Sequence, residues 1–85
     1  MDWDELNGKL RGVVLEVAHL LLPAEVQDIW EYIDYDEPGL AFETLCTQLH
    51  EHDSVVSADT VGRLREVGSA MDLEPRQWQI LRVSN

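Results

Sequence analysis

The residues whose types could do chemistry lie mainly between positions 46 and 54. The run His50-Glu51-His52-Asp53 offers side chains that commonly bind metal ions. On a helix, residues two positions apart point to nearly opposite sides, so the two imidazoles could not reach one ion. The spacing of the other residues places no fourth ligand beside them. We therefore expect histidines on the surface and no metal centre.

A calcium loop and a catalytic cysteine are disfavoured by similar reasoning. The segment Asp34–Asp36 reads Asp-Tyr-Asp, as at the start of a calcium loop, and Gly39 falls at the sixth position. However, Leu45 stands at the twelfth position, where such a loop needs a bidentate glutamate. Cys46 lies on the apolar stripe of a predicted helix, which indicates a buried thiol.

Ser54 raises the possibility of a carrier protein. It follows Asp53 and precedes a valine, which is similar to the Asp-Ser-Leu phosphopantetheine site of acyl carrier proteins. In those small, acidic, helical proteins the serine opens the second helix, and an acidic helix follows it. Here Ser54 comes later, and the next helix carries Arg63 and Arg65. A carrier protein is kept as one alternative. The glycines are scattered singly and form no phosphate-binding loop, so we expect neither an enzyme nor a cofactor.

The elements that position these residues are predicted to be helices. Apolar residues recur at spacings of three and four over positions 3–21, which indicates one amphipathic helix. Proline is favoured in the first turn of a helix, so the three prolines at 23, 38 and 75 predict three helix starts. Asp2 and Ser57 are favourable N-caps. We predict an all-α fold: a compact antiparallel bundle of four helices plus a short C-terminal helix, in a single domain over residues 1–85.

Each predicted helix contributes one apolar stripe to the core. The stripes are Trp3, Leu6, Leu10, Val13, Val14, Val17 and Leu21; Val26, Ile29, Trp30 and Ile33; Phe42, Leu45, Cys46 and Leu49; Val61, Leu64, Val67, Gly68 and Met71; and Trp78 with Leu81. Trp30 and Trp78 are expected to be largely buried, and Trp30→Ala to cost about 3–5 kcal/mol. No segment alternates with period two, so no strand is predicted, and Val55 and Val56 should close the bundle beneath a turn.

Composition indicates a folded protein of the cytoplasm. Of the 85 residues, 45% are hydrophobic, which is enough for a core and too many for a disordered chain. No apolar run is long enough for a membrane helix or a signal peptide, so no membrane partner is expected. The single cysteine excludes an internal disulfide.

Acidic residues are concentrated in the middle of the chain. The net charge is −11, from 17 Asp+Glu and 6 Lys+Arg. Residues 12–62 hold 11 of the acids and no Lys or Arg, whereas the two ends together are neutral. Such a segment repels phosphate, so direct binding of nucleic acid or of anionic lipid is disfavoured. A basic protein surface would be attracted to it.

The helix predicted to begin at Pro23 carries the most informative surface. If its apolar stripe faces inward, a step of about 100° per residue turns its acids and both its tyrosines outward. Tyrosine is frequent among binding hot spots because it combines a large apolar area with a hydroxyl group. Alternatively, one tyrosine packs along a neighbouring helix and the other is an ordinary exposed aromatic. We predict a protein-binding face made of Glu25, Asp28, Glu31, Tyr32, Asp34, Tyr35, Asp36 and Glu37.

Residues 37–81 resemble a known family. The matching runs are Pro38-Gly39-Leu40-Ala41-Phe42-Glu43, Leu45-Cys46, Leu49, Ser57, Val67-Gly68, Met71-Asp72-Leu73 and Trp78-Gln79-Ile80-Leu81. This pattern resembles small immunity proteins of the MafI type. The resemblance implies a cytosolic antidote that binds a cognate secreted or contact-delivered bacterial toxin, often a nuclease, and blocks it. Because a nuclease is basic where it meets phosphate, an acidic inhibitor would complement it. The alternatives are an acidic adaptor and a nucleic-acid mimic for another basic protein.

Overall fold

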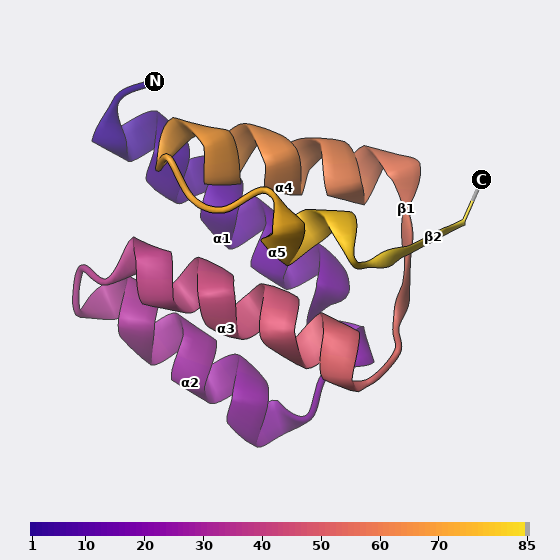
Figure 1. Cartoon of the computed structure of the whole chain (residues 1–85). Coiled ribbons are helices and arrows are strands. Elements are labelled where there is room, and N and C mark those ends of the chain that lie inside the picture. The colour runs from indigo at the N-terminus through magenta and orange to yellow at the C-terminus, as the bar shows by residue number, and fades with distance from the viewer. Residues whose placement is uncertain (85) are drawn as a thin grey trace.

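A computed structural model describes residues 1–84, most of which are helical. The elements in chain order are α1 (Trp3–Val17), the 3-10 turn η1 (Ala18–Leu20), α2 (Pro23–Asp34), α3 (Pro38–Glu51), β1 (Val55–Ser57), α4 (Ala58–Ala70), α5 (Arg76–Gln79) and β2 (Arg82–Ser84). Figure 1 shows α2 and α3 side by side and running in opposite directions, with α4 lying along α1. The predicted helical character is confirmed.

The helices begin where local sequence signals place them. The Asp2 carboxylate accepts a hydrogen bond from the Glu5 backbone N–H at 2.8 Å, and Ser57 Oγ accepts one from the Thr60 N–H at 3.1 Å. Pro23 and Pro38 are the first residues of α2 and α3, where the missing N–H of proline costs nothing. These predicted helix starts are confirmed.

The helices α2, α3 and α4 each end at an aspartate in the left-handed conformation. The φ angles are 60° at Asp36, 52° at Asp53 and 56° at Asp72. After α2, for example, the Glu37 N–H donates to the Tyr32 carbonyl at 2.8 Å and the Asp36 N–H to the Ile33 carbonyl at 3.2 Å. These two backbone hydrogen bonds close the end of the helix. The left-handed residue at such an end is usually glycine, and aspartate is one of the few other residues that tolerate this conformation.

One continuous core joins the helices. The Phe42 and Trp78 rings meet edge to face, with centroids 5.9 Å apart, and Gly68 on α4 lies directly against both. Cys46 is buried in this core, as predicted. The remaining fully buried side chains include Leu10, Val13, Val14, Ile29, Leu45, Leu49 and Leu64, all of them members of the predicted stripes.

Two expectations about individual residues, Trp3 and Val55, are wrong, and a third, for Trp30, holds only in part. Trp3 is 42% exposed, because it lies in the first turn of α1 at the edge of the molecule. Trp30 is only partly buried and packs against the margin of the core. Val56 is buried as expected, whereas Val55 is 51% exposed.

A parallel strand pair replaces the simple turn that the sequence predicted. In β1 and β2, Val55 pairs with Arg82, Val56 with Val83 and Ser57 with Ser84. Three residues per strand are too few for an alternating pattern, which explains why no strand was predicted. The pair ties the end of the described chain to the connection between α3 and α4. Among the described helices, none is both long and apolar enough to cross a membrane.

Candidate partner-binding surface

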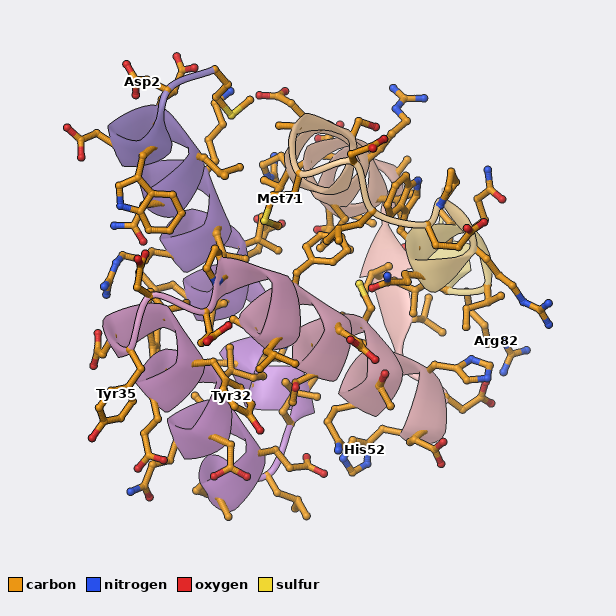
Figure 2. The ribbon with its side chains drawn as sticks, turned by 60° about the vertical axis from the view of Figure 1, so that its left-hand side comes forward. Asp2, Tyr32, Tyr35, His52, Met71 and Arg82 are labelled. Atoms are coloured by element: carbon orange, nitrogen blue, oxygen red, sulfur yellow. The ribbon has the colours of Figure 1, made fainter. Side chains whose placement is uncertain are left out.

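The orientation of α2 about its own axis decides which of its residues face solvent. Ile29 and Ile33 are buried, with Trp30 on one side of them and Tyr32 on the other, and both of these flanking aromatics are half-buried. The helix packs chiefly against α3, and Figure 2 shows Tyr32 on the side of α2 that faces α3. The buried face is therefore rotated toward Tyr32 and away from Trp30, relative to the prediction.

Five of the eight predicted residues lie fully on the surface without a cation beside them. We call Asp28, Glu31, Tyr35, Asp36 and Glu37 the acidic α2 surface. Tyr35 is 79% exposed, and in Figure 2 its ring projects away from the end of α2. Among residues 1–84, no Lys or Arg side chain forms an ion pair with the four carboxylates of this surface.

Tyr32 differs from Tyr35. This fits the alternative interpretation, in which one tyrosine packs along a neighbouring helix and the other is exposed. It is partly buried and packs against the hydrophobic core. Its ring therefore presents only part of its area to solvent, so the prediction that both tyrosines face outward holds fully for Tyr35 and only in part for Tyr32. The reason is the rotation of α2 toward α3.

Glu25 holds two helices together at the start of α2. Its carboxylate accepts a hydrogen bond from the Leu22 N–H at 2.9 Å and contacts His52 Nε2 at 2.7 Å. The hydrogen bond from Leu22, and after it the one with His52, lowers the pKa of the Glu25 carboxyl. Both contacts are made by Oε1, so this carboxylate links the start of α2 to the end of α3.

Asp34 is likewise engaged within the chain. Its carboxylate accepts a hydrogen bond from Arg11 Nη2 at 3.2 Å. The same guanidinium lies over the Trp30 ring, 5.7 Å from the ring centroid, in a cation–π arrangement. The side chains of this pair remain 40% and 65% exposed, so the interaction is a weak one.

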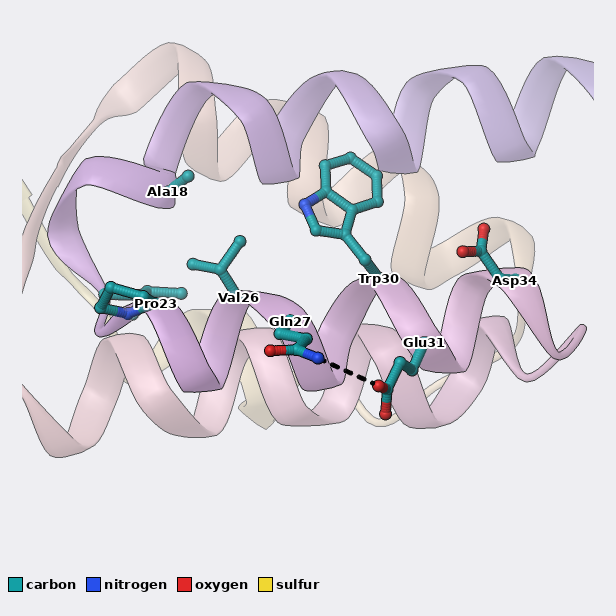
Figure 3. A pocket seen from close by; sticks show the side chains of 8 residues that line it. Ala18, Pro23, Val26, Gln27, Trp30, Glu31 and Asp34 are labelled. Atoms are coloured by element: carbon teal, nitrogen blue, oxygen red, sulfur yellow. Dashed lines mark hydrogen bonds between the residues drawn. The ribbon is translucent and has the colours of Figure 1, made fainter.

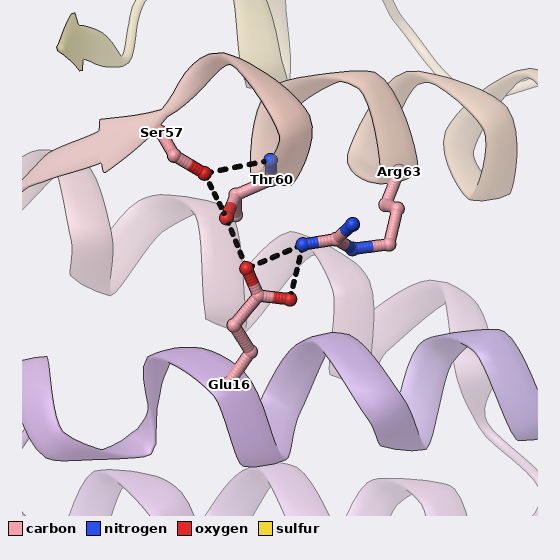
Figure 4. Close-up of polar contacts among 4 residues, drawn as sticks. All are labelled: Glu16, Ser57, Thr60 and Arg63. Atoms are coloured by element: carbon pink, nitrogen blue, oxygen red, sulfur yellow. Dashed lines mark hydrogen bonds and ion pairs between the residues drawn. The ribbon is translucent and has the colours of Figure 1, made fainter. Parts of the chain in front are cut away.

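Most cations of the chain pair with acids outside the acidic α2 surface. Glu16 accepts hydrogen bonds from Arg63 and from Thr60 Oγ1, the latter at 2.6 Å, and so ties α1 to α4 (Figure 4). The further pairs are Lys9 with Glu66, and Arg82 with Asp53 at 2.7 Å. These pairs leave the carboxylates of the acidic α2 surface uncompensated.

An apolar groove between α1 and α2 adds a feature that sequence reasoning missed. This α1–α2 groove has a volume of about 510 Å³ and is lined by Ala18, Leu21, Pro23, Val26, Gln27, Trp30, Glu31 and Asp34. Figure 3 shows Val26 and Trp30 pointing from α2 toward α1, with Gln27, Glu31 and Asp34 along one margin. The only sequence signal was the small Ala18 opposite two large apolar residues of the next helix. Glu31 belongs to both the groove and the acidic α2 surface.

The other candidate chemical groups lie apart from this surface. Burial raises the pKa of the Cys46 thiol to about 12, so the thiol stays protonated at neutral pH. Ser54 is 9% exposed, and its backbone N–H donates to the Leu49 carbonyl. His50 lines a smaller groove of about 270 Å³ between α3 and α5, whereas His52 faces Glu25. Within residues 1–84, no three His, Cys, Asp or Glu side chains are grouped so that they could hold an ion.

Comparison with known proteins adds no further assignment. No family model matches the chain, and neither a curated protein nor a solved structure matches it.

Proposed function

We propose that this chain is a cytoplasmic immunity protein that binds a cognate bacterial toxin domain, a nuclease, and neutralises it. The acidic α2 surface makes the contact. The residue pattern over positions 37–81 that resembles MafI-type immunity proteins supports the class of function. In this proposal the four longer helices act as an antiparallel bundle that serves as the scaffold, and α2 carries the specificity.

One observation carries the proposal. Tyr35 is 79% exposed among four carboxylates that no Lys or Arg of the described chain neutralises. These residues add little stability to the isolated protein, because the tyrosine ring packs against few side chains and the carboxylates form no ion pairs with Lys or Arg of the described chain. Against a basic partner, the same residues supply a desolvated anchor and long-range attraction.

A nuclease is a suitable partner on electrostatic grounds. Its substrate-binding surface must attract phosphate and therefore carries Lys and Arg. An acidic inhibitor covers that surface with complementary potential and associates quickly at low salt. An adaptor or a nucleic-acid mimic would use the same acids, so the identity of the partner separates these alternatives.

The test uses the toxin candidates encoded by the reading frames that flank this gene. Each is expressed with and without this chain, and cell survival is scored together with binding by the purified proteins. The expected result is rescue of growth and a stable complex with one toxin. If none of these products binds, the proposed function is wrong.

Variants then locate the interface on the complex. Tyr35→Ala should raise the dissociation rate, by about 30-fold if Tyr35 is a hot spot worth about 2 kcal/mol. The double variant Asp28→Asn, Glu31→Gln should slow association, and the effect should shrink as salt screens the charges. Asp59→Asn is the control, because it also neutralises a carboxylate but lies at the start of α4, on the opposite side of the molecule from α2. Unchanged binding in the α2 variants, with loss of binding in Arg63 or Arg65 variants, would place the interface elsewhere.

A further inference from the structure

The α1–α2 groove leaves core-type side chains uncovered. Val26 and Trp30 pack against the margin of the core, yet both stay partly exposed where they line the groove. Leu21 and Ala18 complete the apolar wall from the α1 side. The groove has a volume of about 510 Å³ and is wide open to solvent, so it can admit a side chain of a partner protein without a rearrangement of the fold.

The margin of the groove selects for positive charge. Glu31 and Asp34 present carboxylates there. Asp34 pairs with Arg11, whereas Glu31 forms no ion pair with a Lys or Arg among residues 1–84. The side chain of Gln27 donates a hydrogen bond to Glu31 at 3.4 Å, which leaves the charge of Glu31 in place. An apolar wall with an anionic margin complements a ligand that has an apolar body and a cationic end.

Arg11 shows how a guanidinium fits at one end of this groove. It lies over the Trp30 ring and donates to Asp34, so the indole and the carboxylate already form a guanidinium site. The Arg11–Asp34 pair is largely exposed and therefore weak, and it leaves Glu31 as the carboxylate of the groove that pairs with no Lys or Arg among residues 1–84.

We propose that the α1–α2 groove binds a segment of the partner protein in which an apolar side chain is accompanied by an arginine or lysine. The apolar side chain lies against Val26 and Trp30, and the cation pairs with Glu31, because Asp34 is already paired with Arg11. This inference rests on the proposed function for the identity of the partner. The class of ligand rests on the groove alone.

Benzamidine is the probe for the class of ligand, because it joins an aromatic ring to a cationic amidinium. Benzamide, its neutral counterpart of similar shape, is the matched control. Each is titrated into the 85-residue protein while the indole N–H resonance of Trp30 is followed. A Trp30→Phe variant assigns this resonance. We expect benzamidine to shift this resonance at concentrations several-fold lower than benzamide. Glu31→Gln should remove the difference, whereas Glu51→Gln on the end of α3 should not.

Three results with the probe would overturn the inference. They are equal shifts by the two compounds, no shift at Trp30 by either, and a Trp30 resonance that moves with protein concentration alone. The last would mean that a second copy of this chain occupies the groove.

A second pair of variants connects the groove to the partner. Gln27→Arg places a guanidinium beside Glu31 and should weaken binding of the toxin at least tenfold. Gln79→Arg makes the same change on α5, away from the groove, and should have a much smaller effect. If the toxin binds and Gln27→Arg has no effect, the groove is not part of the interface, and the proposed function still stands. If no toxin binds but benzamidine is still selected, the proposed function fails and the class of ligand stands.

Discussion

Gly68 allows α4 to approach two aromatic rings of the core. A Cβ atom placed at this residue would lie 2.9 Å from Trp78 Cε3 and 3.0 Å from Phe42 Cζ, both shorter than ordinary contacts. The backbone of Gly68 is helical, so glycine is needed here because it has no side chain and not because of its conformational freedom. The same residue belongs to the Val67-Gly68 pair that the family resemblance uses.

Gly68→Ala should therefore destabilise the protein by about 1–3 kcal/mol through overpacking. Gly62→Ala on the same helix is the matched control, because a Cβ there meets nothing within 4 Å. The control should stabilise by up to about 1 kcal/mol, since alanine is the better helix former. Urea unfolding of both variants measures the difference, and equal effects of the two substitutions would contradict the packing described above.

Glu16 links the stability of the fold to pH. The hydrogen bonds from Arg63, and after them the one from Thr60, lower the pKa of its carboxyl from the ordinary value of 4.5. A group with a lowered pKa in the folded state stabilises that state above its unfolded pKa, and the contribution is lost as the pH falls through the folded value. The contribution of Glu16 is therefore present at neutral pH and disappears below about 4.5.

Glu16→Gln should lower stability at neutral pH by about 1 kcal/mol or less, because the pair is 46% and 36% exposed. The difference from the parent should shrink as the pH falls below 4.5. Thermal unfolding across this range measures it. Arg63→Gln and the double variant complete a cycle in which the two losses should not add. Additive losses would show that the two residues act separately.

At the scale of elements, the rotation of α2 separates two tryptophans that the sequence predicted to be alike. Trp78 is 3% exposed and packs edge to face on Phe42, whereas Trp30 stays partly exposed in the α1–α2 groove. The same rotation withdraws Tyr32 toward the core and leaves Tyr35 outside. The position of α3 against α2 thus determines both the core and the candidate binding surface.

Trp78→Ala should cost about 3–5 kcal/mol of unfolding free energy, as expected for a buried tryptophan. Trp30→Ala should cost less, about 1–2 kcal/mol, because part of its surface is already in contact with water. Denaturant unfolding of the two variants provides the comparison. A larger loss for Trp30→Ala than for Trp78→Ala would mean that the groove is closed in solution.

At the scale of the whole molecule, repulsion among the excess carboxylates affects stability. The net charge is −11, and four of the six Lys and Arg side chains already form ion pairs. The carboxylates of the acidic α2 surface have no such partners among residues 1–84. A compact chain with this excess of one sign is destabilised by its own field.

Raising the salt concentration from about 0.02 M to about 0.5 M should therefore raise the melting temperature, since the repulsion is screened. The double variant Asp28→Asn, Glu31→Gln should melt higher than the parent at low salt and respond less to added salt. Scanning calorimetry at several ionic strengths tests this. A melting temperature that falls with salt would instead show that attractive pairs dominate.

The sequence by itself determined the features that depend only on residues close together along the chain. The N-caps at Asp2 and Ser57, the helix starts at Pro23 and Pro38 and the burial of Cys46 all follow from spacing and residue type. These signals act within one or two helical turns, so they do not depend on what the helix later packs against. The acidity of residues 12–62 is likewise a property of the sequence alone.

Only the tertiary structure decided how the elements face one another. The pairing of residues 55–57 with 82–84, the exposure of Trp30 and the partial burial of Tyr32 each depend on segments distant in the chain. A periodic pattern locates the apolar stripe of α2 only to within a broad sector, and the neighbour that packs on it selects the part to be buried. The α1–α2 groove exists for the same reason: it is the space that α1 leaves beside Val26 and Trp30 when α2 turns toward α3.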